Sequence, residues 1–143
     1  MKALIISCVI ILGLWVSKPS KTIVTTQDQS SLKESIKRGS DIYADFCVTC
    51  HLPNGKGIEG TFPPLADSDF LRDNLEESIR GVKYGQRGEI TVNGVTYNGF
   101  MARLGLEDDE VADVMNYVNN SWGNKNDKMI TKTEVEAIKA KRK

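Results

Sequence analysis

Hydrophobic residues recur at helical spacing in three stretches of this chain. The first begins near residues 32–35 and ends at about residue 46, and its apolar positions follow the helical period loosely. The second covers about residues 68–84 and is followed by Gly85, a residue type that often ends helices. The third, about residues 107–121, is the most regular, with apolar positions at i, i+3, i+4 and i+7 and acidic residues in its first turn. Its apolar residues are Val111, Val114, Met115 and Val118.

The segment between the second and third helical stretches has the residue pattern of two β-strands. Residues 89–92 and 95–97 are rich in β-prone side chains, and Asn93-Gly94 joins them. Both turn residues tolerate positive φ, so this dipeptide favours a two-residue turn and predicts a short β-hairpin. An irregular segment then leads to the last helix. The expected fold is all-α, with this hairpin as its only strand structure.

The first 20 residues resemble an export segment. Lys2 precedes an apolar run over residues 3–16, and a polar Ser-Lys-Pro segment ends it. The run of about 14 residues is shorter than the ~20 that span a bilayer, which favours a cleaved signal peptide. No small-residue cleavage pair lies near Val16, so residues 1–20 also fit an N-terminal anchor in the inner membrane. Either reading predicts an extracytoplasmic, periplasmic location.

Two polar segments flank the expected domain at residues 35–123. Residues 21–34 are rich in Thr, Ser and Gln, and we expect a flexible linker there. Residues 124–143 are rich in Lys, and we expect a charged, solvated C-terminal tail. Within this tail, Thr131 and Glu134 could instead cap a short helix ending at Lys143.

The charge balance argues against nucleic acid as a partner. The chain has 19 basic and 19 acidic residues, and loss of Lys2 and Lys18 with the leader leaves a net charge of −2. No basic field dominates, whereas binding to a polyanion depends on one. We therefore expect no nucleic-acid partner.

The most specific chemical pattern is Cys47-Val48-Thr49-Cys50-His51, which holds the only histidine of the chain. C-x-x-C-H is the attachment motif of c-type haem. Two thiols three positions apart can add to the two vinyl groups of one porphyrin, and the adjacent imidazole can bind its iron. The motif predicts one covalently attached haem c, held by Cys47 and Cys50, with His51 as an iron ligand.

Three other readings of the cysteines are weaker. A dithiol redox centre normally lies in a βαβ context, and no strand is predicted before Cys47. A structural zinc site needs four ligands, and beyond the motif the chain offers only Cys8, in the apolar leader. A disulfide would staple an exported domain but would give His51 no role.

Three methionines after the leader are candidates for the other face of the iron. Met115 lies on the apolar stripe of the last helix and is better explained by packing. Met129 lies in the polar tail. Met101 lies in the irregular segment before the last helix, where a loop can deliver a thioether to iron. Met101 is therefore the expected second ligand.

These motifs together resemble class I c-type cytochromes over about residues 35–123. The resemblance implies the cytochrome c fold, with three to four helices around a covalently bound haem and a short β-hairpin before the loop of the axial methionine. The hairpin and the end of the last helix are similar to those of small carriers and of domains attached to reductases, oxidases and dehydrogenases. The matching elements are, in order, Gly39, Tyr43, the C-x-x-C-H motif, Pro63-Pro64-Leu65, Met101, Tyr117 and Trp122-Gly123-Asn124.

The resemblance also assigns roles to further residues. Gly39 would let the first and last helices cross closely, because it has no Cβ. Pro63, twelve positions after His51, or the adjacent Pro64 would accept a hydrogen bond from the imidazole Nδ1–H. Three apolar residues would line the haem pocket: Leu65, Phe70 and Phe100.

The expected function is electron transfer. Iron bound by His and Met on its two faces has no open position for a substrate, so we expect an electron carrier and not an enzyme. The expected partners are redox proteins (an oxidase, reductase or dehydrogenase) that a monomer meets through small, transient contacts. Four basic residues could steer an acidic partner: Lys56, Lys83, Arg87 and Arg103.

Two other functions stay open at this point. A haem c domain with a labile sixth ligand would act in ligand binding or as an enzyme subunit, and it would need an exchangeable position on the iron. A thiol–disulfide oxidoreductase would use Cys47 and Cys50 as free thiols and would carry no haem.

Overall fold

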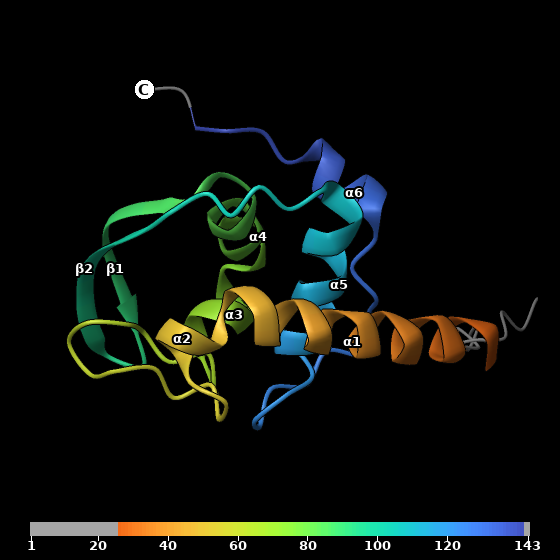
Figure 1. The fold of residues 1–143 in the computed structure, drawn as a ribbon, viewed down its shortest axis with the longest axis horizontal. Helices are drawn as coiled ribbons and strands as arrows, with labels where there is room; N and C mark the ends of the chain where they lie inside the picture. The colour runs from red at the N-terminus through yellow and green to blue at the C-terminus, as the bar shows by residue number, and fades with distance from the viewer. Residues whose placement is uncertain (1–25, 142–143) are drawn as a thin grey trace, which may run out of the picture.

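Helices and one β-hairpin surround an apolar cavity in the computed structural model. The structure describes residues 26–141, with side chains from residue 30 onward. Helices α1 and α5 cross, α4 stands beside them, and a two-stranded hairpin forms the far edge (Figure 1). The elements are α1 (Thr26–Phe46), α2 (Val48–His51), α3 (Asp69–Asp73), α4 (Leu75–Tyr84), β1 (Gln86–Val92), β2 (Val95–Met101), α5 (Asp108–Val118) and α6 (Lys132–Ala137). The expected helical fold with one short hairpin is confirmed.

The crossing of α1 and α5 depends on Gly39. A Cβ at this position would lie 2.0 Å from the carbonyl oxygen of Asp113 and 2.8 Å from Cβ of Tyr117. Only a residue without a side chain lets the two backbones approach so closely. Beside this contact, the Tyr43 and Tyr117 rings lie 5.4 Å apart between centroids, as the expected crossing requires.

A buried polar cluster fixes the register of the same crossing. The Asp113 carboxylate of α5 accepts hydrogen bonds from Ser35 Oγ at 2.6 Å and from Arg38 Nε at 2.5 Å, both on α1. Asn116, one turn along α5, donates to Ser35 Oγ at 2.8 Å. Burying a carboxylate is costly unless charge and hydrogen bonds satisfy it, and these partners do both.

Helix α5 buries the apolar stripe that its sequence predicts. Val111, Val114, Met115 and Val118 are all at most 5% exposed. The helix begins with a reciprocal capping box between Glu107 and Glu110, which satisfies two of its free N–H groups. It ends at Val118, three residues earlier than the spacing suggests.

The stretch predicted as one helix over residues 68–84 is two helices. Ser68 caps α3 by accepting a hydrogen bond from Leu71 N, and Asn74 leaves the helical region with φ −130° and ψ 47°. The chain turns there and resumes as α4, because the Asn74 carbonyl accepts from Ser78 N at 2.9 Å. Gly85, at φ 86°, ends α4 as expected.

The hairpin turns at Asn93-Gly94 as predicted, but its strands are longer. Both turn residues have positive φ, at 50° and 78°, which the right-handed twist of the hairpin favours. Seven residue pairs extend from Val92↔Val95 at the turn to Gln86↔Met101 at the open end. Met101 is therefore the last residue of β2, and the expectation that it lies in an irregular loop is wrong.

Helix α1 begins at Thr26, earlier than the predicted start near residues 32–35. Residues 26–34, expected to belong to a flexible linker, are helical. Once the crossing with α5 fixes α1, extending it by further turns requires only one residue to be ordered per added hydrogen bond. The predicted signal peptide or anchor at residues 1–20 lies outside the described residues. None of the helices within residues 26–141 is long and apolar enough to cross a membrane.

The C-terminal segment packs on the domain, so the expectation of a solvated tail is wrong. Ile130, Val135 and Ile138 are at most 8% exposed and join the core. Thr131 and Glu134 form the capping box of α6, and the helix ends at Ala137 instead of Lys143.

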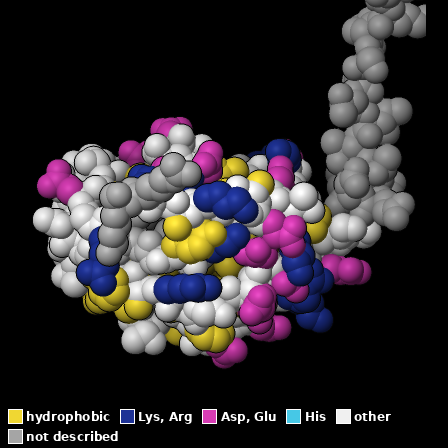
Figure 2. Space-filling model, turned by 90° about the horizontal axis from the view of Figure 1, so that it is seen from above, with side chains coloured by type: hydrophobic (Ala, Val, Ile, Leu, Met, Phe, Trp, Pro, Cys, Tyr) yellow, Lys and Arg dark blue, Asp and Glu magenta, His cyan; other side chains and the backbone are white. Residues whose placement is uncertain are grey.

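Seen from above in Figure 2, basic and acidic side chains are interspersed on this face, with no field of a single sign.

Side chains of α4 hold the C-terminal segment through its backbone. Lys83 Nζ donates to the Val135 carbonyl at 2.8 Å, and Tyr84 Oη donates to the Ile138 carbonyl at 3.1 Å. Arg80 Nε donates to the Lys139 carbonyl at 2.9 Å. These bonds provide donors for carbonyls in the last turn of α6 and directly after it, where a helix has no partners of its own.

Candidate haem site

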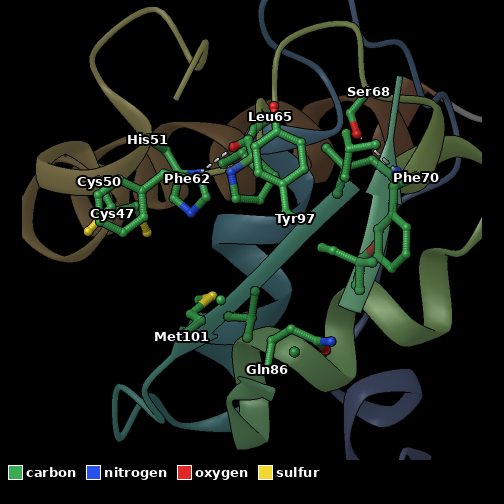
Figure 3. A pocket seen from close by; sticks show the side chains of 18 of the residues that line it. Cys47, Cys50, His51, Phe62, Leu65, Ser68, Phe70, Gln86, Tyr97 and Met101 are labelled. Carbon is green, nitrogen blue, oxygen red and sulfur yellow. Dashed lines mark hydrogen bonds between the residues drawn. The ribbon is translucent and has the colours of Figure 1, made fainter. Parts of the chain in front are cut away.

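A cavity of about 390 Å³ lies between α2, α4, α5 and the hairpin. Figure 3 shows the C-x-x-C-H residues at one side of it and Met101 at another. Its walls are mostly apolar, which suits a large flat cofactor with an apolar rim. The predicted lining residues Leu65, Phe70 and Phe100 all contribute to the walls.

A single helical turn gathers the C-x-x-C-H residues on one face. Cys47 follows α1 directly and caps α2, and His51 N donates to its carbonyl at 2.9 Å. Residues at i, i+3 and i+4 share one side of a helix, so Cys47, Cys50 and His51 all reach the cavity. Two thiols and one imidazole are thereby presented to the same space, as attachment to one porphyrin requires.

The surroundings of Cys47 disfavour its thiolate. Burial, with a further contribution from Cys50, raises the pKa of the Cys47 thiol to about 11. A catalytic dithiol needs a lowered pKa, because the thiolate is the nucleophile. Cys47 and Cys50 do not form a disulfide. Among the described residues, no three His, Cys, Asp or Glu side chains are grouped to hold a metal ion.

The His51 ring is oriented by Pro63. Its Nδ1 lies 3.0 Å from the Pro63 carbonyl oxygen, so Pro63 and not Pro64 is the partner. A carbonyl only accepts, so Nδ1 carries the proton and the Nε2 lone pair is left for a ligand. Burial lowers the pKa of His51 although the Pro63 bond opposes it, which favours the neutral, iron-binding form. Figure 3 shows the ring directed into the cavity.

The hairpin turns one face toward the cavity. Side chains alternate between the two faces of a strand, and the cavity-lining residues of β1 and β2 follow this alternation except Phe100, which is 59% exposed. Val92 and Tyr97, on this face, are at most 4% exposed. Val92 and Tyr97 were not predicted to line the site, although the period of two in the strands is a sequence signal for them. The hairpin residues on this face are Gln86, Gly88, Ile90, Val92, Tyr97, Gly99 and Met101.

The three candidate methionines are placed differently. Met101 lines the cavity from the end of β2, on another side from His51 (Figure 3). Met115 also reaches the cavity wall, but from within the buried stripe of α5 at 1% exposure. Met129 lies against a separate hollow beside α4 and the C-terminal segment. The structure thus brings Met101 and His51 to one cavity and leaves Met129 away from it.

The four basic residues expected to steer a partner are not equivalent. Lys83 is only 12% exposed and forms an ion pair with Asp108 at 2.8 Å, so its expected surface role is wrong. Desolvation lowers the pKa of Lys83, but Asp108 and Tyr84 outweigh it and the net pKa is raised. The Arg87 guanidinium lies over the Phe100 ring at 4.2 Å. Lys56 and Arg103 are exposed.

The helices, the C-x-x-C-H turn and the proline-bound imidazole together define a c-type cytochrome domain. The cytochrome c family model matches residues 36–122, and the chain belongs to this family, whose members carry covalently bound haem c and transfer electrons. It is 40% identical to cytochrome c-552 of Thermus thermophilus over 113 residues, which cover 73% of this chain and 86% of that protein.

Parts of larger proteins are also similar. The cytochrome c subunit of a quinone alcohol dehydrogenase from Gluconacetobacter polyoxogenes is 28% identical over 71% of this chain and 22% of that protein. The cbb3-type cytochrome c oxidase subunit FixP of Bradyrhizobium diazoefficiens is 30% identical over 68% of this chain and 34% of that protein.

Proposed function

We propose that this protein is a mono-haem electron carrier in which His51 and Met101 bind the iron from opposite faces. The observation that carries the proposal is the placement of these two side chains on different sides of one apolar cavity, with two thiols at its rim. Cys47 and Cys50 would hold the porphyrin through thioether bonds. When bound, the haem iron supplies a reversible one-electron change between Fe(II) and Fe(III).

The protein's own groups would set the midpoint potential of the iron and limit the rearrangement on each electron transfer. The Pro63 carbonyl fixes the His51 tautomer and makes the imidazole a stronger donor. The Met101 thioether and the apolar walls both favour the less charged Fe(II), so we expect a positive midpoint potential. Because the same groups bind both oxidation states, little has to rearrange on each transfer.

Electron exchange would take place at the mouth of the cavity. Phe46 and Phe100 both line the cavity and are 48% and 59% exposed, so they lie where it opens to solvent. Small, transient contacts at this opening would suit brief encounters with redox partners. The relatives named as dehydrogenase and oxidase subunits make such enzymes the expected partners of a monomeric, extracytoplasmic carrier without catalysis of its own.

An optical spectrum and an intact mass of the full chain test the proposal. The protein is produced with a competent haem-maturation system, beside a Cys47→Ala/Cys50→Ala control. We expect one covalent haem in the wild type and none in the control. We also expect a methionine-to-iron absorption band in the oxidised protein and no uptake of carbon monoxide in the reduced protein. Colourless wild-type material would overturn the proposal, and ready uptake of carbon monoxide would replace the carrier with the labile-ligand alternative.

A further inference from the structure

The loop of residues 52–68 provides the Pro63 carbonyl that orients His51, yet it has little regular structure. Pro63 and Pro64 have no N–H, so neither can donate a hydrogen bond that fixes the loop. On one side, the Leu65 N–H donates to the Gly55 carbonyl at 2.7 Å. The Ala66 N–H donates to the same carbonyl at 2.9 Å, so on this side the backbone itself holds the loop.

Asn124 holds the other side of the loop. Its Nδ2 donates to the Leu65 carbonyl at 2.6 Å and to the Val118 carbonyl at 2.9 Å, and its Oδ1 accepts from Ser68 N at 3.1 Å. One side-chain amide thus joins the last turn of α5 to two points of the loop. Leu65 is two residues from Pro63, so this attachment lies next to the carbonyl that His51 uses.

Trp122 supports the same attachment. Its carbonyl accepts from Asp67 N at 3.1 Å, and its indole packs on Gly55, where a Cβ would lie 2.4 Å from the ring. Trp122 itself has φ 50°, a left-handed conformation that is rare for a bulky residue and needs support from its surroundings. The segment Trp122-Gly123-Asn124, which follows α5, therefore contacts the loop as well as the helix.

We propose that Asn124 is a positioning residue for the haem site, which keeps the Pro63 carbonyl within hydrogen-bond distance of His51. Asn124 does not line the cavity, so it acts through the Leu65 carbonyl. Without its amide, the Leu65 and Val118 carbonyls lose a donor, and the proline segment is held on the Gly55 side only and moves away from the imidazole more readily. A weaker Nδ1–H bond makes His51 a poorer donor, which disfavours Fe(III) and raises the midpoint potential. The inference rests on the proposed binding of iron by His51.

The test compares full-length holoproteins carrying Asn124→Ala or Asn120→Ala. Asn120 is the matched control. Its Nδ2 donates to the Asn116 carbonyl of α5 at 2.9 Å, and this amide makes no bond to the loop of residues 52–68. Hydrogen exchange of the His51 Nδ1 proton is followed by NMR in the reduced state, and the midpoint potential is measured by titration. We expect exchange about tenfold faster in Asn124→Ala, because a lost buried hydrogen bond favours local opening. We also expect a higher midpoint potential, and neither change in Asn120→Ala.

The outcomes that overturn the positioning role of Asn124 differ from those that overturn the proposed function. Wild-type exchange and potential in Asn124→Ala would overturn the positioning role, as would equal changes in both variants. If Asn124→Ala fails to mature with haem, Asn124→Ser is measured by the same criteria, since its hydroxyl is too short to reach both carbonyls. A wild-type holoprotein whose His51 is not an iron ligand would overturn the proposed function itself.

Discussion

The backbone of Gly39 touches that of Asp113, and a Cβ at position 39 would lie 2.0 Å from the Asp113 carbonyl oxygen. We predict that Gly39→Ala destabilises the holoprotein by about 3 kcal/mol, because α1 and α5 must separate to admit the methyl group. Guanidinium unfolding measures the loss. Ser40→Ala, one position along the same helix, should change the free energy of unfolding by less than about 0.5 kcal/mol. Equal stability of Gly39→Ala and wild type would contradict the close crossing.

Exchange of methionine for leucine distinguishes the two thioethers that reach the cavity. We predict that Met101→Leu abolishes the methionine-to-iron band and lets the reduced protein take up carbon monoxide, because leucine cannot bind iron. Met115→Leu conserves the volume of a buried side chain and should keep both properties at a cost below about 1.5 kcal/mol. The opposite pattern in the optical spectra would make Met115 the ligand.

The docking of the C-terminal segment should contribute to global stability. Val135 is fully buried, and Val135→Ala should lower the free energy of unfolding by about 2 kcal/mol through lost contacts and a small cavity. Glu136→Ala, an exposed neighbour in α6, serves as the control and should change little. Thermal melting followed at the haem and by circular dichroism should shift together in Val135→Ala. A segment that frayed independently of the domain would leave the haem-detected melt unchanged.

The C-terminal segment should also weaken in acid. Lys128 and the Thr131 N–H donate hydrogen bonds to the Glu134 carboxylate and hold the pKa of that carboxylate below its usual value. A lowered folded pKa gives stability that is present above the unfolded pKa of about 4.3 and is lost as the pH falls through the folded pKa. Glu134→Gln should therefore melt below wild type at neutral pH, and the gap should close in acid.

Melting temperatures at pH 7 and at successive steps down to about pH 3 would measure this gap. Glu136→Gln provides the control, because it makes the same substitution at an exposed position of the same helix. A gap for Glu134→Gln that is as wide in acid as at neutral pH would show that the charge of Glu134 does not hold the segment.

The sequence predicts the features that depend on residues close together along the chain. The spacing of Cys47 and Cys50 is set by the porphyrin, and the Asn93-Gly94 turn is set by backbone conformation, so both are visible in the sequence. The stripe of α5 is equally visible because its period matches one buried face. The resemblance to class I c-type cytochromes implied that Pro63 or Pro64 would accept from His51, and the structure shows that it is Pro63.

Features that depend on distant partners were missed for a physical reason. Ile130, Val135 and Ile138 are only three apolar positions in a segment rich in lysine, so the pattern is too sparse to predict a buried face and their packing shows them to be core residues. Lys83 looks like a surface charge until Asp108, far along the chain, pairs with it. The role of Asn124 is likewise hidden, because its partners lie in a loop more than fifty residues earlier.

The pairing of Gln86 with Met101 gives the turn at Asn93-Gly94 an influence over the cavity's sulfur donor. Strand residues alternate in direction, so a slip of one position at the turn would direct the Met101 side chain to the opposite face of β2. With the proposed binding of iron by Met101, this distant dipeptide would determine which side chain reaches the iron. Lengthening this ribbon by one residue would change the coordination chemistry without touching any group that binds the cofactor.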